Sequence, residues 1–214
     1  MFTLYTTPLS ANGRKPLALC QKLGLEPEIR LVNVYQGEGR RPEFLAINPL
    51  GKIPALVDGG LTLCESNAIL VYISEQHGNF GLWSREPRAR AEILRWLFWE
   101  SSAWQPALSV LLAPCVGHRL LPKVVPAPPT APDWQSAETA PLLASLDAQL
   151  AGRMFLTGPE LTIADLAVAG MTTYFRHAEF PSLAHPNLSA WLARIDALEA
   201  WKASADPLWE GEAR

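Results

Sequence analysis

The strongest constraint on the fold is a change of pattern along the chain. Strand and helix signals alternate through residue 79, whereas no convincing strand pattern follows Arg85. An apolar run at residues 2–5 predicts a short strand, and a helix is expected from Asn12 to the glycine at position 24. Pro16 is expected in the first turn of this helix, where its missing N–H costs no hydrogen bond. With a second strand over residues 28–34, the pattern predicts a βαβ unit.

The next elements are a hairpin and a helix. After a short helix near residues 42–47, a strand is expected from Pro54, a turn at residues 58–60, and a returning strand to Cys64. Glu65-Ser66 then opens a helix that ends before Gly78. The N-terminal half therefore has the predicted order βαβ followed by ββα.

The rest of the chain reads as helices alone. Pro87 begins a long helical stretch that Pro106 and Pro114 should kink or end. A proline-rich extended loop is expected at residues 122–132, with helices at 137–150, 162–176 and 187–198. We therefore predict an α/β plus all-α fold class: an α/β domain at residues 1–79, a linker at 80–86, and an all-helical domain at 87–214.

Composition excludes several classes of protein. The 214 residues are 49% hydrophobic and 18% charged, which allows a sizeable core and argues against disorder. A net charge of -3 gives no electrostatic footprint for nucleic acid, and no apolar run approaches the ~20 residues of a membrane span. The N-terminus lacks the features of a secretory signal, so a cytoplasmic protein is expected.

The spacing of the cysteines argues against a disulfide scaffold and against a metal site. The three cysteines stand at positions 20, 64 and 115, with no Cys-x-x-Cys pair and no cluster with histidine. This spacing is a poor match to a disulfide scaffold or a zinc site, so we expect no metal.

The first candidate for chemistry is the segment between the first strand and the first helix, which contains Ser10 and Asn12. Ligands bind at the carboxyl ends of strands in open α/β sheets, and a helix N-terminus adds N–H donors with a partial positive charge. A hydroxyl here could donate to an anion. The alternative is that Ser10 or Asn12 only caps the helix.

Two further segments are candidates for ligand binding. In Lys52-Ile53-Pro54, a cis bond before the proline would leave the backbone of Ile53 facing a cleft, whereas a trans bond would make Pro54 a strand-entry residue. At the next helix start, Ser66 and helix N–H groups suit a carboxylate, and Glu65 suits an ammonium. The alternative for Glu65-Ser66 is helix capping alone.

Taken in order, Ser10, Pro54 and Glu65-Ser66 resemble the N-terminal thioredoxin-like domain of the cytosolic glutathione S-transferase superfamily, in particular its theta-, delta- and bacterial nu-like members. The all-helical second half resembles that family as well. So does the run Leu161-Thr162-Ile163-Ala164-Asp165, which matches its capping box: Thr162 caps the helix and Asp165 reaches back to the N–H of Thr162. We assign Asp165 to folding.

The resemblance implies a role for each matched residue. Ser10 resembles the serine that activates the glutathione thiol, and Asn12 matches an asparagine of nu-like members that shares or takes that role. Lys52, the backbone of Ile53 beside Pro54, and the pair Glu65 and Ser66 are implied to bind glutathione as co-substrate. Many relatives have a histidine five residues before the position of Phe44; here it is Gly39, and Arg40 or Arg41 is the replacement cation.

The implied reaction is attack of the glutathione thiolate on a small hydrophobic electrophile, by a cytoplasmic homodimer that uses no metal, nucleic acid or membrane. The predicted pocket for this electrophile contains Trp99, Ala103, Trp104 and Tyr174. Two alternatives stay open: a glutathione-dependent disulfide reductase or peroxidase, as in nu-like members, and a non-catalytic glutathione-binding module on the same fold.

Overall fold

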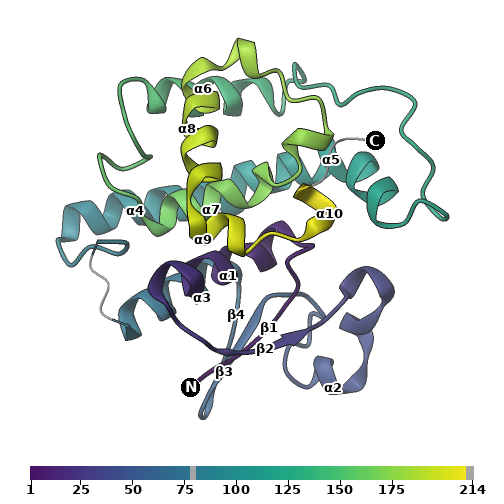
Figure 1. Cartoon of the computed structure of the whole chain (residues 1–214), viewed down its shortest axis with the longest axis vertical. Helices are drawn as coiled ribbons and strands as arrows, with labels where there is room; N and C mark the ends of the chain where they lie inside the picture. Colours follow the sequence, from purple (N-terminus) through teal and green to yellow (C-terminus); the bar gives the residue numbers. More distant parts are fainter. Residues whose placement is uncertain (78–80, 211–214) are drawn as a thin grey trace.

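The sheet of the N-terminal half has four strands in the order β2-β1-β3-β4. Strand β1 (Thr3–Thr6) pairs in parallel with β2 (Glu28–Leu31) and antiparallel with β3 (Ala55–Asp58), and β3 pairs antiparallel with β4 (Leu61–Cys64). This is the predicted βαβ-ββα order, and the architecture is thioredoxin-like. The computed structural model describes residues 1–77 and 81–210 (Figure 1).

Helices cover both faces of this sheet. Helices α1 (Ala11–Leu23) and α3 (Ser66–Gln76) pack on the face turned toward the helical half, where Leu4 and Leu56 are completely buried (Figure 1). A smaller cluster that includes Phe44 of α2 (Pro42–Leu45) packs on the opposite face. Alternation along β1 directs its residues to these two faces in turn.

The second half consists of helices. They are α4 (Pro87–Trp99), a π-helical turn (Glu100–Trp104), α5 (Gln105–Leu120), α6 (Ala140–Leu150), α7 (Ile163–Thr172), α8 (Pro186–Ala197), α9 (Glu199–Ala203) and α10 (Pro207–Glu210). Short 3-10 turns lie at Val34–Gln36, Glu38–Arg40, Phe175–His177 and Ser182–Ala184. One continuous hydrophobic core joins α1 and α3 to α7, which lies at the centre of the helical half (Figure 1).

Several expected boundaries differ from the structure. The first helix begins at Ala11, so Pro16 lies in its second turn rather than its first. The second strand stops at Leu31 because the chain then turns into a 3-10 helix. Both prolines expected to kink or end the long helical stretch lie within α5. Pro106 comes just after the π-helical turn, which widens the backbone ahead of a residue that has no N–H. Pro114 lies inside α5 and does not end it. The predicted linker at residues 80–86 begins outside the described residues and stays a prediction.

Within the described part of the chain, no helix has both the length and the apolar character required to cross a bilayer.

Candidate active site

A cavity of about 560 Å³ opens between the two halves. It is lined by the start of α1, the segment before β3, the start of α3, and the α4–α5 region. The sequence-predicted residues on its walls are Ser10, Asn12, Lys52, Ile53, Pro54, Glu65 and Ser66. Three segments that are far apart in the sequence therefore meet at one site.

A second cavity, of about 320 Å³, lies next to the first. Its wall is mostly apolar and comes from one face of α5, with Met171 and Tyr174 from the helical half and Tyr35 from the N-terminal half. Ser10 and Asn12 line both cavities. These two side chains therefore stand where a group bound in one cavity would meet a group bound in the other.

Ser10 is the N-cap of α1. Its Oγ accepts a hydrogen bond from the N–H of Gly13 at 3.4 Å, and its backbone is extended, as an N-cap requires. The capping interpretation is therefore confirmed, but it does not exclude the other one. A hydroxyl that accepts at its oxygen keeps its proton to donate, so Ser10 can cap the helix and donate to an anion at the same time.

The backbone on both sides of Ser10 is held by Tyr174. The Tyr174 hydroxyl accepts from the N–H of Ala11 at 2.8 Å and donates to the carbonyl of Leu9 at 3.1 Å. Trp209 of α10 donates to the same Leu9 carbonyl at 3.0 Å. Burial, together with nearby Tyr35, raises the pKa of Tyr174 well above its usual value. Tyr174 lines the second cavity, but its hydroxyl is occupied with the Ser10 loop.

The structure decides between the two alternatives left open for the segment before β3. The Ile53–Pro54 peptide is cis, and pairing of β3 with β1 and β4 begins only at Ala55. Asn48 donates to the carbonyl of Lys52 at 2.6 Å and so anchors the peptide group that precedes Ile53. Lys52 itself is exposed at the rim of the larger cavity.

The predicted cation at Arg40 lies elsewhere. Arg40 is exposed and is not among the described residues that line either cavity. Close packing explains why glycine rather than histidine stands at position 39. A Cβ on Gly39 would lie 2.3 Å from the carbonyl oxygen of Gly51. Of the described side chains on the larger cavity's wall, Lys52 is the one cation.

Glu65 and Ser66 begin α3 in an unusual way. Glu65 has φ 69°, a left-handed conformation that costs a non-glycine residue about 1–3 kcal/mol and is concentrated at functional sites. Its carboxylate makes no capping hydrogen bond with the helix. The first N–H groups of this 11-residue helix are thus left without a side-chain cap at the cavity wall, next to the Ser66 hydroxyl. Capping alone does not account for this pair.

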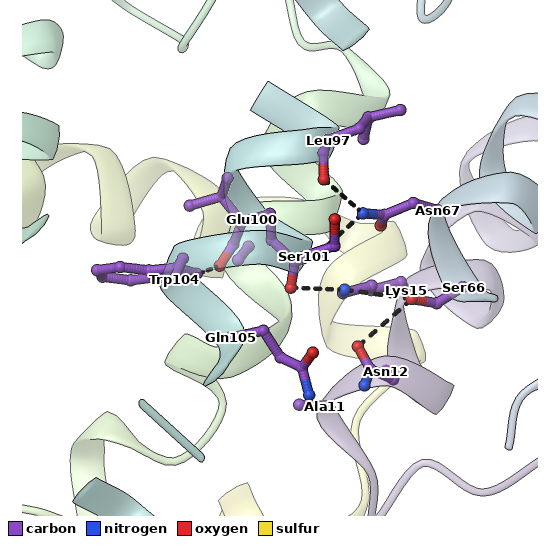
Figure 2. Close-up of polar contacts among 12 residues, drawn as sticks. Ala11, Asn12, Lys15, Ser66, Asn67, Leu97, Glu100, Ser101, Trp104 and Gln105 are labelled. Atoms are coloured by element: carbon purple, nitrogen blue, oxygen red, sulfur yellow. Dashed lines mark hydrogen bonds and ion pairs between the residues drawn. The ribbon is translucent and has the colours of Figure 1, made fainter. Parts of the chain in front are cut away.

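A buried polar network lies behind Ser66 (Figure 2). Its hydroxyl donates to Oδ1 of Asn12 at 3.4 Å and accepts from the ammonium of Lys15 at 3.3 Å. Lys15 forms an ion pair with Glu100 at 2.8 Å, and Asn67 donates to the other oxygen of Glu100 at 2.9 Å. This network was not predicted from the sequence. Its signal was the i, i+3 spacing of Asn12 and Lys15, which puts both on one face of α1.

The predicted electrophile pocket is only partly in place. Trp104 is completely buried and donates to the carbonyl of Val168, and Trp99 stacks on it with ring centroids 5.4 Å apart. Among the described residues, the cavity walls include neither of these tryptophans nor Ala103. The α5 residues found instead keep a helical spacing that the sequence displays: Gln105, Ser109, Leu112, Ala113, Val116 and Leu120.

The protein's three thiols lie away from both cavities. Burial raises the pKa of Cys20 to about 12, and it also raises the pKa of Cys64 and Cys115. The described cavity-lining residues include no cysteine. Nor does any group of three or more His, Cys, Asp or Glu in the described chain have the arrangement of a metal site.

Comparisons with known proteins agree with this architecture. Residues 1–75 match the family model "Glutathione S-transferase, N-terminal domain", and residues 130–194 match "Glutathione S-transferase, C-terminal domain". The chain is 31% identical to Glutathione S-transferase F10 of Arabidopsis thaliana, over 94% of this chain and 95% of that protein. It is 28% identical to Glutathione S-transferase D7 of Drosophila melanogaster, over 98% and 91% of the two chains.

A solved structure shows the same fold. It is a delta-class glutathione transferase of Nilaparvata lugens, with a TM-score of 0.83 and 26% identity, over 99% of this chain and 96% of that one. The resemblance seen in the sequence is therefore confirmed across both halves. The chain belongs to the glutathione S-transferase family and is a glutathione transferase.

Proposed function

We propose that glutathione binds in the larger cavity and that Ser10, with Asn12, activates its thiol as a thiolate for attack on a small hydrophobic electrophile in the smaller one. The observation that carries this proposal is that Ser10 and Asn12 line both cavities. In this arrangement Glu65, Ser66 and the start of α3 take the γ-glutamyl end of glutathione. The backbone of Ile53 takes the cysteinyl unit, and Lys52 is the cation for the glycyl carboxylate.

The energy that thiol activation needs is small. A free thiol has a pKa near 8.5, and lowering it by ~2 units requires about 2.7 kcal/mol of preference for the thiolate. A hydrogen bond to a charged group contributes ~1.5–3 kcal/mol and a helix N-terminus ~0.3–1 kcal/mol. One hydroxyl at the start of α1 therefore suffices.

Side chains are better placed than backbone groups to supply that hydrogen bond. In the first turn of α1, the N–H of Ala11 is taken by Tyr174 and the N–H of Gly13 by Ser10. The side chains of Ser10 and Asn12 both face the cavities. We therefore expect Ser10 to be the main donor, with Asn12 as its partner.

The experiment that tests this proposal is a titration of thiolate absorbance with glutathione bound, for the wild type, Ser10→Ala and Asn12→Ala. We expect a thiol pKa well below the free value in the wild type. In Ser10→Ala it should return toward the free value, with a fall in kcat of about 10- to 100-fold, the equivalent of one charge-assisted hydrogen bond. Asn12→Ala should give a smaller shift.

Other outcomes would contradict the proposal in distinct ways. Bound glutathione with an unshifted thiol pKa in the wild type would favour a non-catalytic binding module. A shift that Asn12→Ala abolishes and Ser10→Ala leaves unchanged would move the activating role to Asn12. Absence of glutathione binding would overturn the assignment of the larger cavity.

We also propose that the protein is a homodimer, as the family resemblance implies. Phe98 of α4 lies at the larger cavity and is 68% exposed, so it offers a large apolar contact to a second copy. Light scattering at micromolar concentration should give twice the chain mass of 23.5 kDa, and the mass of a single chain would reject the proposal. The cytoplasmic location stays a prediction.

A further inference from the structure

The ammonium of Lys15 is buried directly behind the cavity wall. Lys15 is 0% exposed and lies one helical turn after Asn12 on α1. Its Nζ is 3.3 Å from Oγ of Ser66 and 2.8 Å from Oε1 of Glu100 (Figure 2). It therefore links the start of α3 in one half of the protein to the α4–α5 region in the other.

The fold makes specific room for this side chain. Helix α7 passes over Lys15 at Gly170, where a Cβ would lie 2.6 Å from Cε of the lysine. Both oxygens of its partner Glu100 are used, one by Lys15 and the other by the side-chain amide of Asn67. Burial lowers the pKa of Lys15, and Glu100 opposes that shift. The charge is thus compensated rather than solvated.

Stability alone does not explain a charged pair at this place. Replacing a buried ion pair with apolar side chains of similar volume is often neutral or stabilising, because the desolvation of two charges offsets their attraction. The position of the Lys15–Glu100 pair, next to the larger cavity, indicates a role in ligand binding instead. Both partners of Lys15, Ser66 and Glu100, line the cavity, and of the two only Ser66 has a proton to donate, in one direction at a time.

We propose that Lys15 is a positioning residue that directs the Ser66 hydroxyl toward the α-carboxylate of the γ-glutamyl group; this inference rests on the proposed glutathione site. Because the ammonium occupies an acceptor position of Oγ, the Ser66 proton points away from it. In the structure the Ser66 hydroxyl donates to Oδ1 of Asn12 with the two oxygen atoms 3.4 Å apart, which is long for an O–H···O hydrogen bond. A carboxylate at the cavity wall is a stronger acceptor and would replace the Asn12 amide oxygen.

The charge itself adds to this effect. A ligand carboxylate that accepts from the Ser66 hydroxyl would be joined through it to the Lys15 ammonium, which in turn pairs with Glu100. A hydroxyl that accepts from a cation is polarised and becomes a better donor. Lys15 therefore selects a ligand that has a carboxylate at this point, without touching the ligand itself.

Two ligands and one substitution test this inference. Calorimetry would measure the Kd of glutathione, and of the analogue γ-aminobutyryl-cysteinyl-glycine, which lacks the α-carboxylate, with the wild type and Lys15→Met. We expect Lys15→Met to weaken glutathione binding by about 10- to 100-fold. Binding of the analogue should weaken by less than about threefold, because the group that Ser66 would hold is absent from it.

The matched control is Lys22→Met, which removes an exposed lysine from the last turn of the same helix and should leave both Kd values unchanged. If Lys15→Met does not fold, the double variant Lys15→Met/Glu100→Gln removes both charges and keeps an acceptor for Asn67. It should show the same selective loss of glutathione binding, with little change for the analogue. An equal loss for both ligands, or no loss, would overturn the inference while the glutathione site stands. A wild type that binds neither ligand would overturn both.

Discussion

Asp165→Ala is expected to lower the free energy of unfolding by about 3–5 kcal/mol, a large part of the ~5–15 kcal/mol that stabilises a typical domain. Asp165 is completely buried at the start of α7. Its Oδ2 accepts from the N–H of Thr162 at 3.0 Å, which is the predicted Asp165 half of the capping box, and from the Thr162 hydroxyl at 3.1 Å. The measurement is denaturant unfolding followed by tryptophan fluorescence.

The size of this loss comes from the other carboxylate oxygen. Oδ1 accepts from the N–H of Leu156 at 2.9 Å and from the indole N–H of Trp191 on α8 at 3.0 Å. Without the carboxylate, two buried donors lose their acceptor, at a cost of about 1–3 kcal/mol each. Burial raises the pKa of Asp165, so the hydrogen bonds only partly offset its desolvation, and Ala regains part of that cost.

Two comparison variants make this result specific. Asp165→Asn keeps one acceptor oxygen but presents an amide N–H₂ to donors, so it should also destabilise, by less than Ala does. Glu199→Ala breaks an exposed i, i+3 ion pair with Lys202 and should change stability by less than about 0.5 kcal/mol. A loss with Asp165→Ala no larger than with Glu199→Ala would show that the network is not needed for folding.

Gly13→Ala is expected to destabilise the protein by about 3 kcal/mol, although helix propensity alone favours Ala over Gly by ~1 kcal/mol. In α1, a Cβ on Gly13 would lie 2.3 Å from the carbonyl oxygen of Thr7 and 2.6 Å from Oγ1 of Thr6. The first contact is with backbone, which cannot move aside as a side chain does. The start of α1 would have to shift away from the end of β1.

The same shift should reach the active site. The N–H of Gly13 is the group that Ser10 caps, and the Thr6 hydroxyl donates to the carbonyl of Gly13 at 3.1 Å. We therefore expect Gly13→Ala to bring the pKa of the bound glutathione thiol back toward its free value, in addition to lowering the midpoint of urea unfolding. Both quantities are measured on the same preparation.

Gly117→Ala in α5 is the matched control. The three atoms nearest to a Cβ at this position all belong to the side chain of Val125, the first at 3.3 Å, so a small side-chain adjustment is enough. Its stability should stay within about 1 kcal/mol of the wild type. If Gly13→Ala is as stable as Gly117→Ala, the close packing of α1 on the Thr7 carbonyl is not a constraint on the fold.

The sequence by itself determined the features that depend on neighbouring residues. Hydrophobic periodicity and turn residues identify the βαβ-ββα order, the hairpin at residues 58–60, and the helical second half. The capping box of Asp165 is readable because its two partners are three residues apart. Local hydrogen bonds and side-chain alternation produce these patterns, and such interactions act within a few positions.

Only the tertiary structure decided which distant groups meet. Tyr174 bonds the backbone on both sides of Ser10 from the far half of the chain, and Lys15 pairs with Glu100, 85 residues away. The smaller cavity takes most of its wall from one face of α5, whereas Trp104 turns into the core. These contacts follow from how α1, α5 and α7 pack around a common core, and packing depends on the shapes of all the elements together rather than on any local pattern.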